Sequence, residues 1–316
     1  MAKKGKINIG VIGTGWVTST YHLPCLSKIE NANIGAICDI DAERIEKAAK
    51  EYKIKEKFSD YREMLKIVDI DAVYVTTRPD VISRIVIDCL NAGKHVFLEK
   101  PPGVNLVECK KMLKAADKNK RITMVGFNRR YSPIYLKARE IVEKSGGITQ
   151  VVGEFHKNLF NKGEYYGISV LRSDIIHMLD VVRWLGGEPV KVFKIIDKFL
   201  TDWRSGFNAL IKFKNGITGA LLSNYVSGTR YERYEIHGRE IMVELMPPKY
   251  LKVFASRKET IINSKDLTGT DDDKVNYGFM GENRCFVDCV LNNKKPVTSL
   301  DDSVITMKLI EMIERQ

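Results

Sequence analysis

The sequence lacks the features of a membrane or secreted protein. Its 316 residues contain no run of about 18 apolar residues, the length that a membrane-spanning helix needs. The chain begins Met1-Ala2-Lys3-Lys4 and reaches its first apolar segment without the pattern of a signal peptide. Its 6 cysteines form no CxxC pair and have no metal-site spacing to histidine. We therefore expect a reduced, cytoplasmic protein without a bound metal.

Negative charge is also in deficit. The chain has 51 Lys and Arg against 40 Asp and Glu, which gives a formal net charge of +11. The excess is spread out, because residues 1–128 carry 22 basic and 16 acidic side chains and the remaining residues carry 29 and 24. No nucleic-acid motif accompanies it. The sequence therefore predicts no nucleic-acid or membrane partner, and an anionic small substrate stays open as one reason for the charge.

The first 130 residues alternate between strand-like and helix-like segments, and Asp41 is expected to cap one of the helices. Alternation of this kind is typical of a doubly wound parallel sheet with right-handed crossovers. We predict an α/β protein whose residues 1–128 form a dinucleotide-binding Rossmann domain. The predicted strands are 7–12, 34–38, 72–76, 95–98 and 122–127, and the predicted helices are 16–29, 42–52, 81–92 and 106–118.

The pattern changes after residue 130, where strand-like segments follow one another with turn signals such as Asn215-Gly216 between them. Such a run predicts an open, largely antiparallel sheet, so residues 129–316 are expected to form an α+β domain for substrate binding and oligomerisation. Only 175–185 interrupts the run as a helix, and a helix over 299–315 is a candidate for packing back on the first domain. The predicted strands are 151–156, 190–199, 207–213, 217–225, 231–237 and 241–245.

A glycine-rich turn ends the first predicted strand. Gly13 and Gly15 would let the backbone turn tightly and approach a pyrophosphate, with Trp16 and Val17 beside it at the start of the next helix. The third glycine of the usual G-x-G-x-x-G pattern is replaced by threonine. Asp39, after the second strand, can accept hydrogen bonds from an adenosine ribose and would repel a 2′-phosphate. This favours NAD, with NADP as the alternative.

Glu99-Lys100-Pro101 stands at the carboxyl end of a predicted parallel strand, the edge at which ligands bind in such sheets. Together with other segments in the same order, it makes residues 7–186 resemble the glucose-fructose oxidoreductase / inositol dehydrogenase (Gfo/Idh/MocA) family. The other matching segments are the glycine turn, Asp39, Thr76-Thr77-Arg78-Pro79-Asp80, Ala92-Gly93-Lys94-His95-Val96, Gly126-Phe127-Asn128-Arg129-Arg130 and His177-Met178-Leu179-Asp180.

The resemblance implies hydride transfer between nicotinamide and a secondary hydroxyl or keto group of a sugar, polyol, nucleotide-sugar or related substrate. Lys100 would contact the reacting oxygen, and His177 would be the general acid/base. The family commonly has Asp four residues before that histidine, whereas this chain has Ser173 there and Asp174 next to it. Either Asp174 takes over substrate binding, or Ser173 marks a subgroup with different chemistry. The remaining cofactor candidates are Thr76, Thr77 and Glu99, with Lys100 in both roles.

Further candidates for substrate binding are polar or aromatic residues that follow the sixth strand or precede the histidine helix. Arginines here could bind an anionic substrate or pair with carboxylates between the domains, and aromatic side chains could stack on a sugar or simply pack. These candidates are Asn128, Arg129, Tyr166, Arg172 and Ser173, with Arg130 beside them.

The resemblance leaves two alternatives to a dehydrogenase. One is a redox-neutral glycosidase that uses tightly held NAD, and the other is a non-enzymatic sensor that binds nicotinamide nucleotides. In each case the open sheet of the second domain is expected to make a homodimer or homotetramer.

Overall fold

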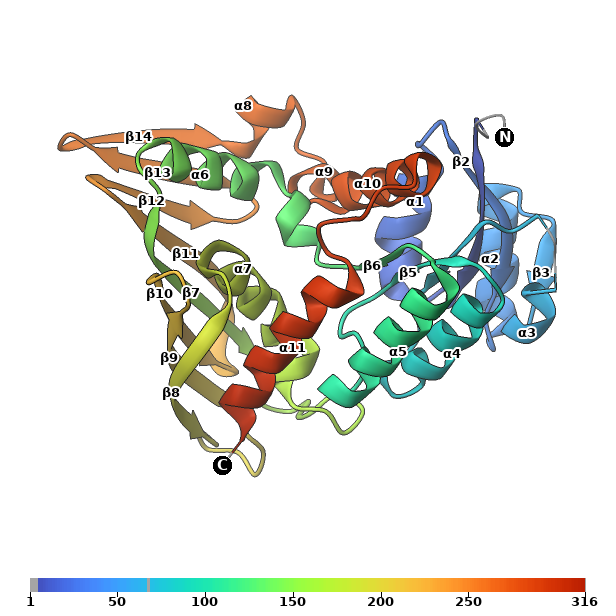
Figure 1. The fold of residues 1–316 in the computed structure, drawn as a ribbon, viewed down its shortest axis with the longest axis horizontal. Coiled ribbons are helices and arrows are strands. Elements are labelled where there is room, and N and C mark those ends of the chain that lie inside the picture. Colours follow the sequence, from blue (N-terminus) through green and yellow to red (C-terminus); the bar gives the residue numbers. More distant parts are fainter. Residues whose placement is uncertain (1–4, 67–68, 316) are drawn as a thin grey trace. The chain divides into compact units, whose positions relative to one another are not determined.

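The computed structural model describes residues 5–66 and 69–315, and it divides into two compact units (Figure 1). The first unit comprises the chain up to Phe127 together with Phe279–Val304, and the second comprises Asn128–Gly278 with the segment from Ile305 onward. Each unit has its own sheet and its own apolar core. No helix in the described ranges is both long and apolar enough to span a membrane.

A 6-stranded parallel sheet in the order β3-β2-β1-β4-β5-β6 forms the first unit. This order reverses between β1 and β4, which makes their carboxyl ends the switch point at which ligands bind in doubly wound folds. The predicted Rossmann architecture is thus confirmed. Its strands are β1 (Ile7–Ile12), β2 (Ala32–Cys38), β3 (Glu56–Phe58), β4 (Ala72–Val75), β5 (His95–Leu98) and β6 (Thr123–Val125).

The connecting helices lie against this sheet with amphipathic faces. Asp41 caps α2 by accepting hydrogen bonds from the backbone N–H groups of Glu43 and Arg44, as predicted. The predicted helix over 16–29 is confirmed from Trp16 to Leu26, although Thr18–His22 is π-helical and the helix ends three residues early. The helices are α1 (Leu23–Leu26), α2 (Ala42–Tyr52), α3 (Tyr61–Met64), α4 (Pro79–Asn91) and α5 (Leu106–Asn119).

The first unit also takes in a helix from late in the chain, α10 (Phe279–Asn292), which packs against α1 and β1. Aromatic rings add contacts with neighbouring elements: Tyr21 of the π-helical turn stacks on Phe279 with centroids 4.0 Å apart, and Phe286 meets Tyr74 of β4 and Phe97 of β5 edge-on. This helix is not among those predicted from the sequence.

An 8-stranded sheet in the order β14-β13-β12-β11-β7-β10-β9-β8 dominates the second unit. All neighbouring pairs are antiparallel except β7 and β10, so the prediction of a largely antiparallel sheet is confirmed. Its strands are β7 (Ile148–Asn158), β8 (Pro189–Asp197), β9 (Gly206–Phe213), β10 (Thr218–Asn224), β11 (Val226–Gly238), β12 (Ile241–Met246), β13 (Tyr250–Ala255) and β14 (Lys258–Asn263).

Helix α7 packs closely on this sheet at two glycines. A Cβ atom on Gly153 of β7 would lie 2.8 Å from Met178, and one on Gly219 of β10 would lie 3.0 Å from Val182. The predicted helices over 175–185 and 299–315 are confirmed, but the expectation that only 175–185 interrupts the run of strands is wrong. The helices are α6 (Pro133–Lys144), α7 (Ile176–Gly186), α8 (Ser264–Thr268), α9 (Asp273–Asn276) and α11 (Leu300–Glu314), of which α11 begins in the first unit.

Candidate active site

The glycine turn after β1 depends on a close approach of two backbones. Gly13 has φ +94°, and a Cβ atom there would lie 2.7 Å from the carbonyl oxygen of Thr76, at the end of β4. The Thr76 hydroxyl also donates to the Gly13 carbonyl at 2.7 Å. A side chain at Gly13 is excluded by both conformation and space, as the glycine motif indicated.

Open space surrounds the next part of the turn. Apart from its chain neighbours, no described residue has an atom within 4 Å of the Cβ position of Gly15, and Trp16 is 71% exposed, with its ring edge-on to Tyr21. Thr18, which stands where the usual motif has its third glycine, is buried, and its hydroxyl donates to the Thr76 hydroxyl at 2.7 Å. The threonine therefore ties the turn to β4.

Asp39 follows β2 and holds the same turn from the other side. Its Oδ2 accepts hydrogen bonds from the backbone N–H of Thr14 at 2.6 Å and from the Thr14 hydroxyl at 2.9 Å, while Oδ1 accepts from the Asp41 N–H. A carboxylate has about four lone-pair sites, so acceptor capacity remains for a ribose hydroxyl. Nearby, the buried hydroxyl of Thr77 has no hydrogen-bond partner among the described residues.

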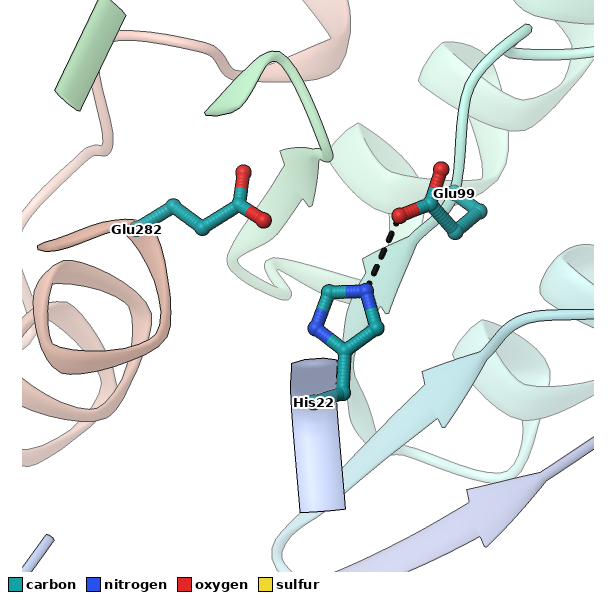
Figure 2. A group of neighbouring side chains, drawn as sticks. All are labelled: His22, Glu99 and Glu282. Atoms are coloured by element: carbon teal, nitrogen blue, oxygen red, sulfur yellow. Dashed lines mark hydrogen bonds and ion pairs between the residues drawn. The ribbon is translucent and has the colours of Figure 1, made fainter. Parts of the chain in front are cut away.

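Lys100 follows β5, and the residue before it fixes its backbone. Glu99 is buried, and its Oε2 accepts the Lys100 N–H at 3.0 Å. Its Oε1 lies 2.9 Å from Nε2 of His22, and because a carboxylate has no proton to donate, the imidazole is the donor (Figure 2). Lys100 itself is half-buried.

Glu282, on α10, points toward this pair (Figure 2). One ligand atom from each of His22, Glu99 and Glu282 lies within 4.8 Å of the other two, and all three side chains are buried. Burial raises the pKa of the Glu282 carboxyl well above its usual value, and the Glu99 charge raises it further. Sequence analysis missed both His22 and Glu282, because nothing in their local pattern marks them.

In the second unit, His177 lies half-buried on α7, directly after a π-helical turn at Leu171–Ile175. Asp174 belongs to that turn. Its Oδ2 accepts a hydrogen bond from the Tyr225 hydroxyl at 2.9 Å and pairs with the Lys157 ammonium at 2.5 Å. Lys157 and Tyr225 come from the neighbouring β7 and β10 region, and sequence analysis missed both.

The other residues around the histidine helix are engaged within the second unit. The Ser173 hydroxyl donates to the Ser169 carbonyl, and Arg172 pairs with Glu314 of α11 at 2.5 Å. Tyr166 lies in the preceding loop, 48% exposed and edge-on to Tyr165.

Two arginines near the start of the second unit are buried in ion pairs. Arg129 forms two hydrogen bonds with Glu232, at 2.5 and 2.9 Å, and Arg130 does the same with Asp180. Burial alone would raise the pKa of Glu232, but the Arg129 charge and its hydrogen bonds lower it to about 2. Both carboxylates belong to the second unit, so these arginines pair within one unit and not, as the second interpretation had it, between the domains. Asn128 donates its side-chain N–H to the Tyr277 carbonyl.

The predicted site residues thus fall into two groups, one in each unit. In the first unit, the glycine turn, Asp39, Thr76, Thr77 and Lys100 all follow strand ends at the carboxyl edge of the parallel sheet. In the second unit, Asp174 and His177 lie three residues apart where the π-helical turn meets α7.

Comparison with known proteins identifies both parts of the chain. Residues 7–127 match an oxidoreductase family with an NAD-binding Rossmann fold, and residues 135–244 match the GFO/IDH/MocA C-terminal domain. The chain is 31% identical over 193 residues to inositol 2-dehydrogenase of Salmonella paratyphi B, a match that covers 60% of this chain and 57% of that protein. It is 26% identical over 328 residues to myo-inositol 2-dehydrogenase of Thermotoga maritima, which covers 96% and 94% of the two chains.

Solved structures share the fold. Levoglucosan dehydrogenase, in a complex with NADH and levoglucosan, superimposes with a TM-score of 0.87 at 21% identity, over 98% of this chain and 96% of that one. A likeness at this identity establishes the common architecture.

Proposed function

Because the chain belongs to the Gfo/Idh/MocA family of NAD-binding oxidoreductases, we propose that it transfers hydride between NAD and a secondary hydroxyl or keto group of a polyol or sugar. The observation that carries the proposal is the meeting of Gly13, Thr76 and Lys100 at the carboxyl edge of a sheet with strand order 3-2-1-4-5-6. The inositol dehydrogenases among the relatives support a polyol substrate.

The residues of the first unit fit a dinucleotide. Gly13 permits the tight turn, and the empty space at Gly15 leaves room for a pyrophosphate against backbone N–H groups. Asp39 keeps acceptor capacity for a ribose diol, which favours NAD over NADP. The orphaned Thr77 hydroxyl gives the same edge an unused hydrogen-bonding group. We propose that these residues, with Trp16, Val17 and Thr76, hold the cofactor.

The chain's own residues would accept the proton of the substrate hydroxyl and stabilise the negative charge that develops on its oxygen. Bound NAD supplies the hydride acceptor. We propose that the Lys100 ammonium stabilises negative charge on the substrate oxygen as its proton leaves, and that His177 accepts this proton. An imidazole suits this task because its ordinary pKa lies near neutrality.

Asp174 is the proposed substrate-binding carboxylate in place of the acid that the family commonly carries at the position of Ser173. Its Oδ2 is occupied by Lys157 and Tyr225, which fix the carboxylate. Such a carboxylate can accept hydrogen bonds from substrate hydroxyls, and it suits a neutral polyol better than an acidic sugar. The ion pairs of Arg129 and Arg172 also favour a neutral substrate, because glutamates already balance the charges of both arginines.

The test is NADH formation by the purified protein with NAD and a panel of inositols and sugars. We expect steady NADH accumulation, and a Lys100→Met variant should lose about 100-fold or more in kcat while its affinity for NADH changes little. Lys110→Ala, an exposed lysine on α5, is the control. Product formation without NADH accumulation would indicate a redox-neutral reaction, and NADH binding without any turnover would indicate a sensor.

We also propose that the chain assembles through the outer face of its 8-stranded sheet. Phe193 and Leu210 are cross-strand partners on β8 and β9, and they are 59% and 60% exposed. Ile195 and Leu222 extend the same face. An exposed apolar surface of this kind on a regular sheet is typical of a subunit interface.

The cysteines support a reducing compartment such as the cytoplasm. All six are free thiols, and five of them are buried. Burial raises the pKa of Cys38 and Cys109 to about 12 each, so these thiols stay protonated and unreactive.

A further inference from the structure

Glu282 is a buried carboxyl group to which the proposed reaction assigns no task. It lies on α10 with 0% of its surface exposed. Neither of its carboxyl oxygens has a hydrogen-bond partner among the described residues. An ionised carboxylate in such a place would lack the donors that normally compensate burial, so this position requires an explanation.

The groups that face Glu282 include a second carboxylate. Glu99 and His22 lie on one side, and the hydroxyl of Tyr74, also buried and unpartnered in the described structure, lies near. Cys285 is the other titratable neighbour. The rings of Phe97 and Phe286 pack on each other and on His22 and Tyr74, and they supply no polar group. Two negative charges in this apolar surrounding would repel each other strongly, because the local dielectric constant is low.

Glu99 is the member of the pair better placed to hold a negative charge, because Oε2 accepts a backbone N–H and Oε1 lies within hydrogen-bond distance of an imidazole nitrogen. Oε1 accepts from His22 and Oε2 accepts from the backbone of Lys100. The Glu99 carboxylate can accept a hydrogen bond from a third donor without losing either of these two bonds. The ligand atoms of the cluster lie within 4.8 Å of one another, a span that a rotation of the Glu282 side chain or one bridging water would close.

We propose that Glu282 carries a proton and is a positioning residue for Lys100, acting through Glu99. The neutral carboxyl group donates to Glu99, and Glu99, held by both Glu282 and His22, fixes the Lys100 backbone at the end of β5. The proposal rests on the role given to Lys100 above. It assigns a function to a contact that joins α10 to a strand end 183 residues earlier in the chain.

The same three side chains could be considered as ligands of a divalent cation, but two of them are already in use. His22 turns Nε2 toward Glu99 and Nδ1 toward the Asn283 amide, at 3.2–3.4 Å, and both oxygens of Glu99 accept N–H groups. Glu282 is the only one of the three side chains without a hydrogen-bond partner among the described residues, so a cation would compete with the hydrogen bonds that His22 and Glu99 already make. A proton accounts for the cluster without breaking any of these bonds.

Two substitutions separate a proton donor from a packing residue. Glu282→Gln keeps the size of the side chain and an N–H donor, whereas Glu282→Leu keeps much of the volume and removes the donor. Glu282→Met, which adapts more easily to the space, replaces Glu282→Leu if that protein does not fold. Each variant is compared with the wild type by kinetics, by hydrogen exchange of the segment around Lys100, by infrared spectroscopy and by metal analysis.

We expect the wild type to show the infrared band of a protonated carboxyl group at neutral pH, and Glu282→Gln to lack it. Glu282→Gln should keep kcat within about 3-fold, whereas Glu282→Leu should lose about 10-fold or more in kcat with a similar KM for NAD. Exchange at the Lys100 amide should quicken only in the apolar variants, because Glu99 then holds that N–H less firmly.

Three results would overturn the proposal. They are an infrared spectrum unchanged by Glu282→Gln, one equivalent of divalent metal that Glu282→Gln loses, and wild-type kcat and Lys100 protection in the apolar variants. If no substrate supports turnover in the wild type, the proposed function fails separately. The infrared and hydrogen-exchange measurements still decide the state of Glu282 and its link to Lys100.

Discussion

Asp174 stands one residue after the position at which the family commonly carries an aspartate, and its carboxylate is nevertheless fixed by neighbouring side chains. It belongs to a π-helical turn, and its carboxylate is fixed by Lys157 and by the Tyr225 hydroxyl. The Lys157 ammonium also lies over the ring of Phe155, 4.9 Å from its centroid. These contacts give Asp174 a fixed orientation three residues before His177.

Replacing Lys157 by methionine should therefore weaken substrate binding selectively. The change removes the charge partner of Asp174 and keeps the apolar stem, so the carboxylate loses orientation while the fold persists. We expect the KM for the polyol to rise about 10-fold, equivalent to about 1.4 kcal/mol, with the KM for NAD unchanged. Steady-state kinetics with each substrate varied in turn measures both constants. Lys162→Met, an exposed lysine in the next loop, is the control, and an equal rise in both KM values would contradict the interpretation.

Residues of the site differ in how far the sequence could predict them. Gly13, Asp39 and Lys100 stand beside strand ends that local patterns predict, so their edge of the sheet follows from the chain order. Lys157 and Glu282 have no such local pattern, and they become relevant only through contacts with residues distant in the chain. Tertiary contacts of this kind are not encoded in the spacing of neighbouring residues.

At the scale of elements, the turn between β1 and the π-helical segment offers a matched pair of glycines. An alanine at Gly13 would need φ +94° and would place its Cβ atom 2.7 Å from the Thr76 carbonyl oxygen. We expect Gly13→Ala to lower the free energy of unfolding by about 1–3 kcal/mol, because a positive φ and a backbone clash both oppose it. A thermal unfolding curve measures this loss.

Gly15→Ala should behave in the opposite way. Its Cβ atom meets nothing within 4 Å, so stability should change by less than about 1 kcal/mol. The methyl group would nevertheless occupy the space assigned to the pyrophosphate, and we expect NADH affinity, followed by fluorescence titration, to fall about 10-fold or more. Unchanged affinity in Gly15→Ala would argue against this turn as the cofactor site.

The ion pair that joins Arg129 to β11 should make the protein sensitive to acid. The pKa of Glu232 is lowered from 4.5 to about 2 in the folded protein, so the folded state binds fewer protons than the unfolded state between these pH values. This contribution to stability is present above pH 4.5 and is lost as the pH falls toward 2. Urea unfolding from pH 6 to pH 3 should show a shallower decline for Glu232→Gln than for the wild type. Parallel declines would exclude this source of acid sensitivity.

The elements themselves were predicted where the local sequence shows an apolar pattern, as in the almost entirely buried β1 and β5 and the amphipathic α2. β1, α2 and β5 have the predicted bounds. α6 was missed although Ser132-Pro133 and buried residues at a helical period precede and line it. β14 is an edge strand with mostly exposed residues and therefore has no alternation to detect. The π-helical turns at Thr18–His22 and Leu171–Ile175 depend on tertiary packing and have no sequence signature comparable to a cap.

For the whole molecule, the net charge of +11 says little about which partners the protein binds. The placement of exposed apolar side chains says more. Many of the basic residues, such as Arg129, Arg130 and Arg233, are already paired with carboxylates. The outer face of the 8-stranded sheet instead exposes Phe193 and Leu210 side by side. A surface of this composition lowers its free energy by burial, at about 25 cal/mol per Å² of apolar area.

If the chain assembles through that face, as proposed, a charge placed on it should prevent the assembly. We expect the wild type to have the mass of a dimer or tetramer in light scattering after size exclusion, and Leu210→Glu to have that of a monomer. An isologous interface brings each substitution close to its symmetry mate, so one change per chain places two like charges in a desolvated surface. Val107→Glu, on the exposed face of α5 in the other unit, introduces the same charge at a residue of similar exposure and should leave the mass unchanged. A wild-type monomer, or a Leu210→Glu protein that keeps the full oligomer mass, would exclude this face as the interface.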